Sequence, residues 1–106
     1  MNNKIVISKE FSETPGGRYK KYGKNSGEEF REELLQPRFL DALEKNRKLE
    51  IDFDGGYGYP VSFLEEAFGG LARLYGQDKV LKTLIFKSKD EPSLITEVID
   101  YILGRS

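Results

Sequence analysis

The chain has 106 residues and a formal net charge of −1, from 17 basic and 18 acidic side chains, which is the size of a single domain over residues 1–106. It contains no cysteine and no histidine, which excludes disulfides, thiolate catalysis, cysteine-based zinc sites and imidazole as a general base. The near-neutral charge argues against bulk nucleic-acid binding, and without a long apolar run or a signal-peptide pattern we expect a cytoplasmic protein with no membrane segment and no cofactor.

The first third of the chain predicts one strand, one loop and one interrupted helix. Residues 5–7 are a short β-branched run typical of a buried strand. The stretch 14–27 is rich in glycine and lysine and predicts a loop that carries most of the basic charge. Ser26 and Glu29 have capping-box spacing, which predicts a helix start at Ser26. Pro37 then predicts a kink or a restart of that helix.

The remainder of the chain alternates between strand and helix patterns. Residues 49–53 alternate apolar and acidic side chains, as in a strand. Ser62 and Glu65 repeat the capping-box spacing, so Ser62 should cap a second helix over about residues 63–75. Residues 83–86 predict a further strand, and 94–102 predict a closing helix. This order predicts an α/β domain with a mostly parallel or mixed sheet of about four strands and helices packed on it.

Two glycines stand inside the second predicted helix. Gly69 and Gly70 would each cost roughly 1 kcal/mol relative to alanine at an exposed helical position. We therefore expect another backbone to approach the helix closely there. That backbone could belong to the domain's own sheet or to a partner chain.

Two pairs of motifs carry a resemblance to a known family. They are Gly16-Gly17-Arg18 with Ser26-Gly27-Glu28-Glu29-Phe30-Arg31-Glu32-Glu33-Leu34-Leu35, and Leu49-Glu50-Ile51-Asp52-Phe53-Asp54-Gly55 with Ser62-Phe63-Leu64-Glu65-Glu66-Ala67-Phe68-Gly69-Gly70-Leu71. Over roughly residues 14–75 the chain resembles a bacterial STAS-like domain family of unknown function, distantly related to anti-sigma-factor antagonist (STAS) domains. The resemblance implies a STAS-like fold and a regulatory, protein-binding role without enzyme activity.

The resemblance also implies a candidate modification site. In the wider superfamily, a serine at the start of the helix after the equivalent strand can be phosphorylated by a partner ATPase kinase, and Ser62 matches that position. The residues around it differ from the superfamily pattern, because Val61 and Phe63 replace an aspartate and a glycine. Ser62 therefore has two interpretations, a helix cap and a phosphorylatable switch that partners a histidine-kinase-type ATPase.

A loop with three glycines and two tyrosines follows the strand at 49–53. It lies where a parallel strand ends, the usual position of binding sites in α/β domains. Tyrosine offers a large apolar area with a polar tip, which suits contact with a protein. Alternatively, one tyrosine belongs to the core and the glycines only make the turn. The predicted partner-binding residues are Asp54, Tyr57, Tyr59, Phe63 and Arg18.

Other residues suggest two alternative functions. Asp52 and Asp54 flank Phe53 and so share one side of an extended strand, where they could hold Mg²⁺ in a small metal-dependent or nucleotide-handling enzyme. The basic residues of the loop at 18–24 alternate with Tyr19 and Tyr22, a pattern that can follow a phosphate backbone weakly. The acidic charge of the rest of the chain favours a protein partner over nucleic acid.

Overall fold

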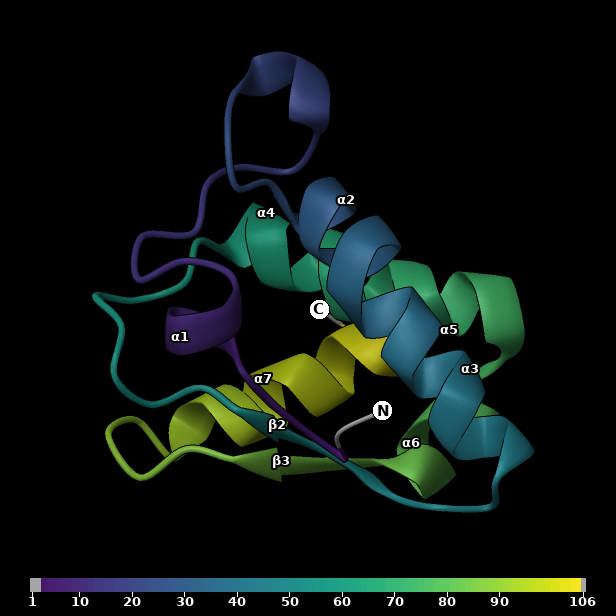
Figure 1. Cartoon of the computed structure of the whole chain (residues 1–106). Helices are drawn as coiled ribbons and strands as arrows, with labels where there is room; N and C mark the ends of the chain where they lie inside the picture. Colours follow the sequence, from purple (N-terminus) through teal and green to yellow (C-terminus); the bar gives the residue numbers. More distant parts are fainter. Residues whose placement is uncertain (1–2, 106) are drawn as a thin grey trace.

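Three parallel strands form the sheet within residues 3–105, the part of the chain that the computed structural model describes (Figure 1). They are β1 (Lys4–Val6), β2 (Leu49–Asp52) and β3 (Leu84–Lys87), in the spatial order β1-β2-β3. The expected α/β class is confirmed, with three strands in place of about four. No helix in the described residues is long and apolar enough to cross a membrane.

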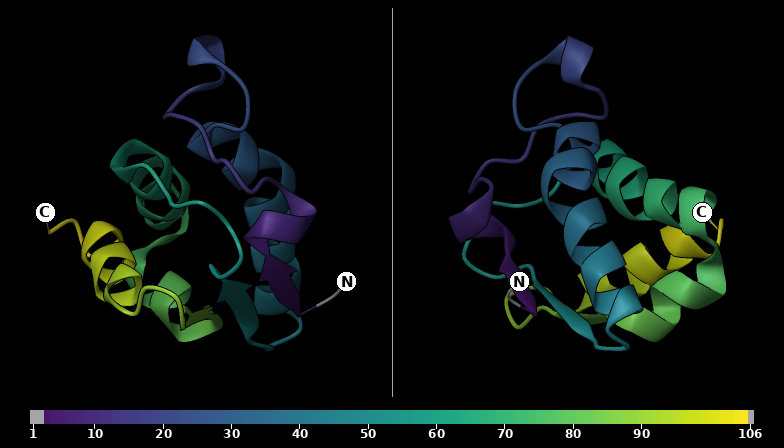
Figure 2. Two further views of the ribbon diagram at one scale, coloured as in Figure 1. Left: turned by 90° about the vertical axis from the view of Figure 1, so that its left-hand side faces the viewer. Right: turned by 45° about the vertical axis from the view of Figure 1, so that its right-hand side comes forward.

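The helices gather on one face of this sheet (Figures 1 and 2). Successive side chains of a strand point to opposite faces, so the two faces of the sheet differ in composition. Ile5 and Ile51 are fully buried on the helical side. The other face carries a mixed set of paired charges: Lys4, Glu50, Asp52 and Lys87.

One interrupted helix connects β1 to β2. It consists of α2 (Gly27–Phe30), the π-helical segment η2 (Arg31–Leu35) and α3 (Gln36–Glu44). The predicted cap is confirmed, because the Ser26 hydroxyl accepts a hydrogen bond from the Glu29 N–H at 3.0 Å. The Glu29 carboxylate in turn accepts from the Asn25 N–H at 3.2 Å. The predicted restart is at the start of α3: the wide π turn ends at Leu35, and Pro37, whose ring nitrogen has no N–H to donate, is the second residue of α3.

The connection from β2 to β3 is built in the same way and ends in an additional helix. Its segments are α4 (Val61–Leu64), the π-helical η3 (Glu65–Gly69), α5 (Gly70–Tyr75) and α6 (Gln77–Thr83). Helix α6 was not predicted; it starts after Gly76, which turns the chain with a φ of 99°. Helix α7 (Ser93–Ile102) closes the fold, and two short helical turns, α1 (Ile7–Glu10) and η1 (Lys20–Tyr22), lie in the N-terminal part.

The prediction that Ser62 caps the second helix is wrong by two residues. Pro60 is the N-cap residue, with extended dihedrals (φ −60°, ψ 145°), and Val61 is the first helical residue. The Pro60 carbonyl oxygen accepts the first helical hydrogen bond from the Leu64 N–H at 3.2 Å. Ser62 therefore lies inside the first turn, and the capping box with Glu65 does not form.

Glycines allow the two interrupted helices to pack closely, but at a different place from the predicted one. A Cβ atom on Gly27 would lie 2.5 Å from the Phe63 carbonyl oxygen, so α2 and α4 touch through backbone there. At Gly70 a Cβ atom would instead meet the side chain of Arg31, 2.9 Å from its Nε atom. The predicted close approach of a backbone to Gly69 and Gly70 is therefore wrong; the two glycines make room for side chains.

Candidate functional site

The loop after β2, residues 53–60, lies at the carboxyl edge of the sheet and is held by the N-terminal segment. The Ser8 hydroxyl donates to the Asp54 carbonyl oxygen at 3.0 Å. The Tyr57 N–H donates to the Glu13 carbonyl oxygen at 2.9 Å. These bonds join the loop to the chain that follows β1, since the carboxyl ends of parallel strands meet at one edge of a sheet.

The same loop is also held by the chain that follows β3. The Asp54 carboxylate accepts from the Lys89 N–H at 2.8 Å and from the Asp90 N–H at 2.9 Å. The Asp90 carboxylate accepts from the Gly55 N–H at 3.2 Å. The hydrogen bonds from the Asp90 and Lys89 backbones lower the pKa of the Asp54 carboxyl group. Asp54 thus has a structural role in fixing the loop, whatever else it contacts.

The two tyrosines of the loop have opposite environments. Tyr57 is 84% exposed and is the most exposed large apolar side chain in residues 3–105. Tyr59 packs edge-on against Phe53, with ring centroids 5.4 Å apart, and its hydroxyl donates to the Phe53 carbonyl oxygen at 2.8 Å. Burial raises the pKa of the Tyr59 hydroxyl. Of the two interpretations of the loop, the core role fits Tyr59 and the contact role fits Tyr57.

A shallow hollow of about 210 Å³ lies between this loop and the start of α7. The loop wall carries the aromatic rings of Phe53 and Tyr59, and the α7 wall carries the acidic side chains Asp90 and Glu91. Its lining residues are Phe53, Gly56, Gly58, Tyr59, Ser88, Asp90, Glu91 and Leu94. Gly56 and Gly58, the chain neighbours of Tyr57, line the hollow.

The two residues at the start of α4 that were predicted as site residues also differ in exposure. Phe63 is fully buried and packs 5.6 Å from Phe30 and 6.1 Å from Tyr59, measured between ring centroids. It therefore offers no surface to a partner, and its place in the predicted contact set is wrong. Ser62 is partly exposed in the first helical turn, next to Val61, which is 59% exposed.

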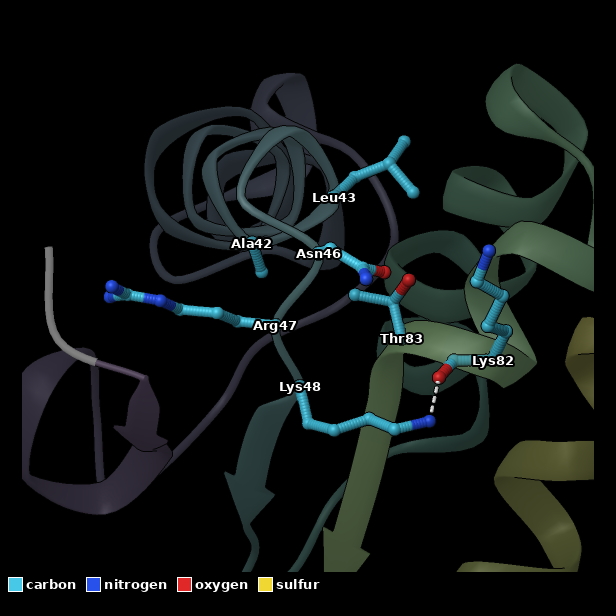
Figure 3. A pocket seen from close by; sticks show the side chains of 7 residues that line it. All are labelled: Ala42, Leu43, Asn46, Arg47, Lys48, Lys82 and Thr83. Carbon is cyan, nitrogen blue, oxygen red and sulfur yellow. Dashed lines mark hydrogen bonds between the residues drawn. The ribbon is translucent and has the colours of Figure 1, made fainter.

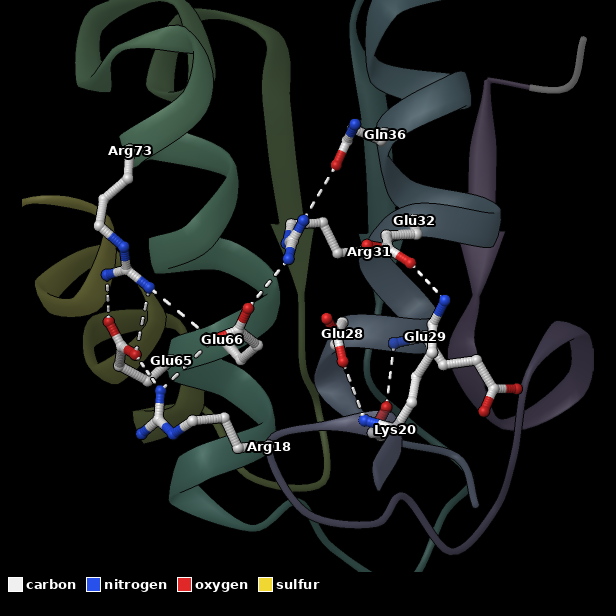
Figure 4. Close-up of polar contacts among 11 residues, drawn as sticks. Arg18, Lys20, Glu28, Glu29, Arg31, Glu32, Gln36, Glu65, Glu66 and Arg73 are labelled. Carbon is white, nitrogen blue, oxygen red and sulfur yellow. Dashed lines mark hydrogen bonds and ion pairs between the residues drawn. The ribbon is translucent and has the colours of Figure 1, made fainter. Parts of the chain in front are cut away.

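Arg18 lies in an ion-pair network rather than free in solution (Figure 4). Its guanidinium pairs with Glu65 and lies 3.6 Å from Glu66. Arg73 pairs with Glu65 at 2.5 Å, and Arg31 pairs with Glu66 at 2.9 Å. The hydrogen bonds from Arg73 and Arg18 lower the pKa of Glu65. The network joins the N-terminal loop to the two interrupted helices.

Sequence reasoning missed this network because its members are far apart in the chain. Arg31 and Glu66 both lie in the recognised motifs, yet 35 positions separate them. Gly70 is the signal that could have indicated the network, since the absence of a Cβ atom there admits the Arg31 side chain. The two glycines were interpreted only as a place where another backbone comes close, whereas a side chain fills the space at Gly70.

The rest of the basic loop is partly neutralised by α2 and η2. Lys20 Nζ pairs with Glu32 at 2.5 Å, and the Lys20 N–H donates to Glu28 at 2.9 Å (Figure 4). Lys21 Nζ lies 5.1 Å from the centroid of the Tyr22 ring. Neighbouring carboxylates thus offset the charge of Lys20.

Asp52 and Asp54, the candidate magnesium ligands, point to different partners. Asp52 accepts a hydrogen bond from the Asp54 N–H at 2.9 Å and lies 3.6 Å from the Lys87 ammonium. The carboxylate of Asp54 is engaged by the loop after β3, as described above. Within residues 3–105, no group of three or more acidic side chains is arranged to hold a metal ion.

A second hollow lies at the opposite, amino edge of the sheet (Figure 3). It measures about 40 Å³, which is enough for water only, and Lys48 closes it by donating to the Lys82 carbonyl oxygen. Its lining residues are Ala42, Leu43, Asn46, Arg47, Lys48, Lys82 and Thr83. This small size does not favour the amino edge as the candidate site.

The fold and the carboxyl edge together define a small two-layer α/β domain that presents a fixed loop beside the N-terminal end of a helix. The chain belongs to the STAS-like domains of unknown function (DUF4325), whose family model matches residues 26–94. The family resemblance seen in the sequence motifs is thus confirmed. The matched range runs from the Ser26 cap to the start of α7 and includes the whole candidate loop. No match was found among curated proteins or among solved structures.

Proposed function

We propose that this chain is a non-enzymatic regulatory module that binds a protein partner at the carboxyl edge of its sheet. One observation carries the proposal: the loop at 53–60 is tied both to the chain that follows β1 and to the chain that follows β3, while its Tyr57 side chain is 84% exposed. A fixed loop loses little further conformational entropy on binding, and an exposed tyrosine supplies a large contact area. Val61, 59% exposed at the start of α4, extends the apolar part of this surface.

We further propose that the partner is a histidine-kinase-type ATPase and that it phosphorylates Ser62. The family resemblance supports this partner class, and the partial exposure of Ser62 in the first turn of α4 supports its access to a kinase. A phosphate is favoured near a helix N-terminus. Glu65 lies one helical turn further on and is paired with Arg18. A phosphate on Ser62 would compete with Glu65 for that guanidinium and would loosen the N-terminal loop.

The contact surface is tested with Tyr57→Ser. Partners are first isolated from the native cell with the wild-type chain as bait, and their affinities for the variants are then measured by titration calorimetry. We expect Tyr57→Ser to keep the melting temperature and to weaken partner binding at least tenfold. Tyr22→Ser is the matched control, because Tyr22 is 71% exposed but lies on the basic loop. Equal binding by the wild-type chain and Tyr57→Ser would contradict the proposed surface.

The switch is tested with three substitutions of Ser62. Because Ser62 is not the cap residue, Ser62→Ala should change the free energy of unfolding by less than about 0.5 kcal/mol. Ser62→Asp should weaken binding to the ATPase by adding a charge, whereas Ser62→Thr should leave it near the wild-type value. Mass spectrometry of the native protein should detect phosphate on Ser62. Unchanged binding by Ser62→Asp, together with an unmodified serine, would rule out the switch and leave the contact surface standing.

A further inference from the structure

The basic loop, residues 18–24, projects from the body of the domain. Its helical turn η1 stands clear of the other helices in every view (Figures 1 and 2). All six residues at 19–24 are exposed, and they include three lysines and two tyrosines. The Tyr22 side chain alone is 71% exposed. The loop therefore presents both positive charge and aromatic surface to solvent.

Hydrogen bonds fix the loop at its base. The Gly16 N–H donates to the Asn25 carbonyl oxygen at 2.7 Å, which closes the two ends of the loop on each other. The Glu28 N–H donates to the Arg18 carbonyl oxygen at 3.0 Å, and the Glu28 carboxylate accepts from the Lys20 N–H at 2.9 Å. A surface that is already fixed in this way loses little conformational entropy on binding.

The two tyrosines of the loop form one surface together with a lysine. The ring centroids of Tyr19 and Tyr22 are 5.9 Å apart, and the Lys21 ammonium lies 5.8 Å from the first ring and 5.1 Å from the second. A hollow of about 350 Å³ opens beside them, with room for a side chain. Its lining residues are Tyr19, Lys20, Lys21 and Glu28.

The basic side chains of the loop differ in whether they have an acidic partner. Arg18 and Lys20 each pair with a glutamate of the interrupted helices. Within residues 3–105, in contrast, Lys21 and Lys24 take part in no ion pair. Both are exposed. Two positive charges without an acidic partner thus remain on the loop, next to the exposed Tyr22 ring.

We propose that the basic loop binds an acidic segment of a protein, at a surface separate from the carboxyl edge. Carboxylates of that segment pair with Lys21 and Lys24, and an apolar side chain lies against Tyr22 beside the hollow. The surface is separate because the hydrogen bonds of the loop at 53–60 reach Ser8 and Glu13 on the N-terminal side, and not the basic loop.

A protein segment suits this loop better than a nucleic acid does. The affinity for a nucleic acid rises with the number of phosphates that are neutralised, and the loop offers only two lysines without an acidic partner. A nucleic acid also carries a charge at every nucleotide and would bring phosphates close to Glu28, which lines the hollow. A protein segment can place an uncharged residue there. The Lys21 ammonium, moreover, already lies over the two rings on which bases would stack.

An NMR titration of the full chain tests this binding. The probe is a synthetic peptide in which pairs of acidic residues alternate with single leucines. We expect amide shifts at residues 19–24 and a dissociation constant that rises with salt. Lys21→Gln with Lys24→Gln should raise that constant by about fivefold or more. Lys79→Gln with Lys82→Gln is the matched control, because it removes the same charge from two exposed lysines near α6 and should stay within about twofold.

Two further variants separate this surface from the carboxyl edge. Tyr22→Ser should weaken binding of the acidic peptide by about fivefold or more, whereas Tyr57→Ser should leave it unchanged. The two tyrosines thus have opposite effects on the acidic peptide and on the carboxyl-edge partner. A failure of the peptide to bind therefore leaves the proposed function standing, and a failure of Tyr57→Ser to weaken the carboxyl-edge partner leaves the basic loop standing.

Two other probes test the chemistry of the ligand. The same peptide with glutamine in place of each acidic residue should bind about tenfold more weakly or not at all. Oligothymidine at the same salt concentration should bind more weakly than the acidic peptide. The proposal is overturned if millimolar acidic peptide causes no shift at residues 19–24, or if the Lys79 and Lys82 control loses as much affinity. Tighter binding of oligothymidine would overturn it in favour of a nucleic-acid ligand.

Discussion

Replacing Arg31 by methionine removes the central charge of the network that joins η2 to η3 (Figure 4). The side chains of Arg31 and Glu66 are 11% and 10% exposed, with 2.9 Å between their paired atoms. Methionine keeps most of the apolar stem of arginine but leaves the Glu66 carboxylate in a site with little water. The substitution should therefore destabilise the fold through an uncompensated buried charge.

The expected magnitude follows from the distances around Glu66. Two unit charges 2.9 Å apart interact by about 6 kcal/mol at an effective dielectric constant of about 20. Breaking a buried pair typically costs about 3–5 kcal/mol. Arg18 and Arg73 remain 3.6 Å and 4.0 Å from Glu66, so part of its charge stays balanced. We expect a loss of about 3 kcal/mol, a large fraction of the roughly 5–15 kcal/mol that stabilises a domain of this size.

Urea unfolding followed by circular dichroism measures this loss. Arg31→Met with Glu66→Leu is the informative double variant, because it removes both charges and also the Arg31 Nε atom, which is buried without a hydrogen-bond partner. It should recover most of the free energy of unfolding. A loss below about 1 kcal/mol in the single variant, or no recovery in the double variant, would refute the buried-charge argument.

Two further predictions concern packing and pH. Gly27→Ala should lower the free energy of unfolding by roughly 1–3 kcal/mol, because the new methyl group would meet the Phe63 carbonyl oxygen at 2.5 Å. Gly17→Ala is the control, because Gly17 has open space around it. In the same urea titration it should change the free energy of unfolding by less than about 0.5 kcal/mol. The pKa values of Asp54 and Glu65 are lowered in the folded state, so their stabilisation is complete above the ordinary carboxyl pKa and is lost as the pH falls through the folded values. The urea midpoint should therefore fall between pH 5 and pH 2, and an unchanged midpoint over that range would contradict the role given to these carboxylates.

Short sequence patterns correctly predicted the structural elements that depend only on residues close together in the chain. The Ser26 cap depends on two residues three positions apart, and the restart of the helix depends on Pro37, the second residue of α3; both are present in the structure. The alternation at 49–53 placed β2, since one face of the sheet is apolar and the other charged. Local patterns failed at Ser62, because Pro60 with its extended backbone could start the helix equally well, and the spacing to Glu65 did not distinguish the two starts.

By itself, the sequence determined the α/β class, the family and the position of the candidate loop, because each of these depends on residues that are close together in the chain or on a motif read as a whole. Only the tertiary structure decided which loop residues are exposed: Tyr57 projects, whereas Tyr59 and Phe63 pack inside. It also decided that Arg18 pairs with Glu65, 47 positions away. The physical reason is that burial and charge pairing are set by distances in space, and these depend on how the two interrupted helices pack across Gly27.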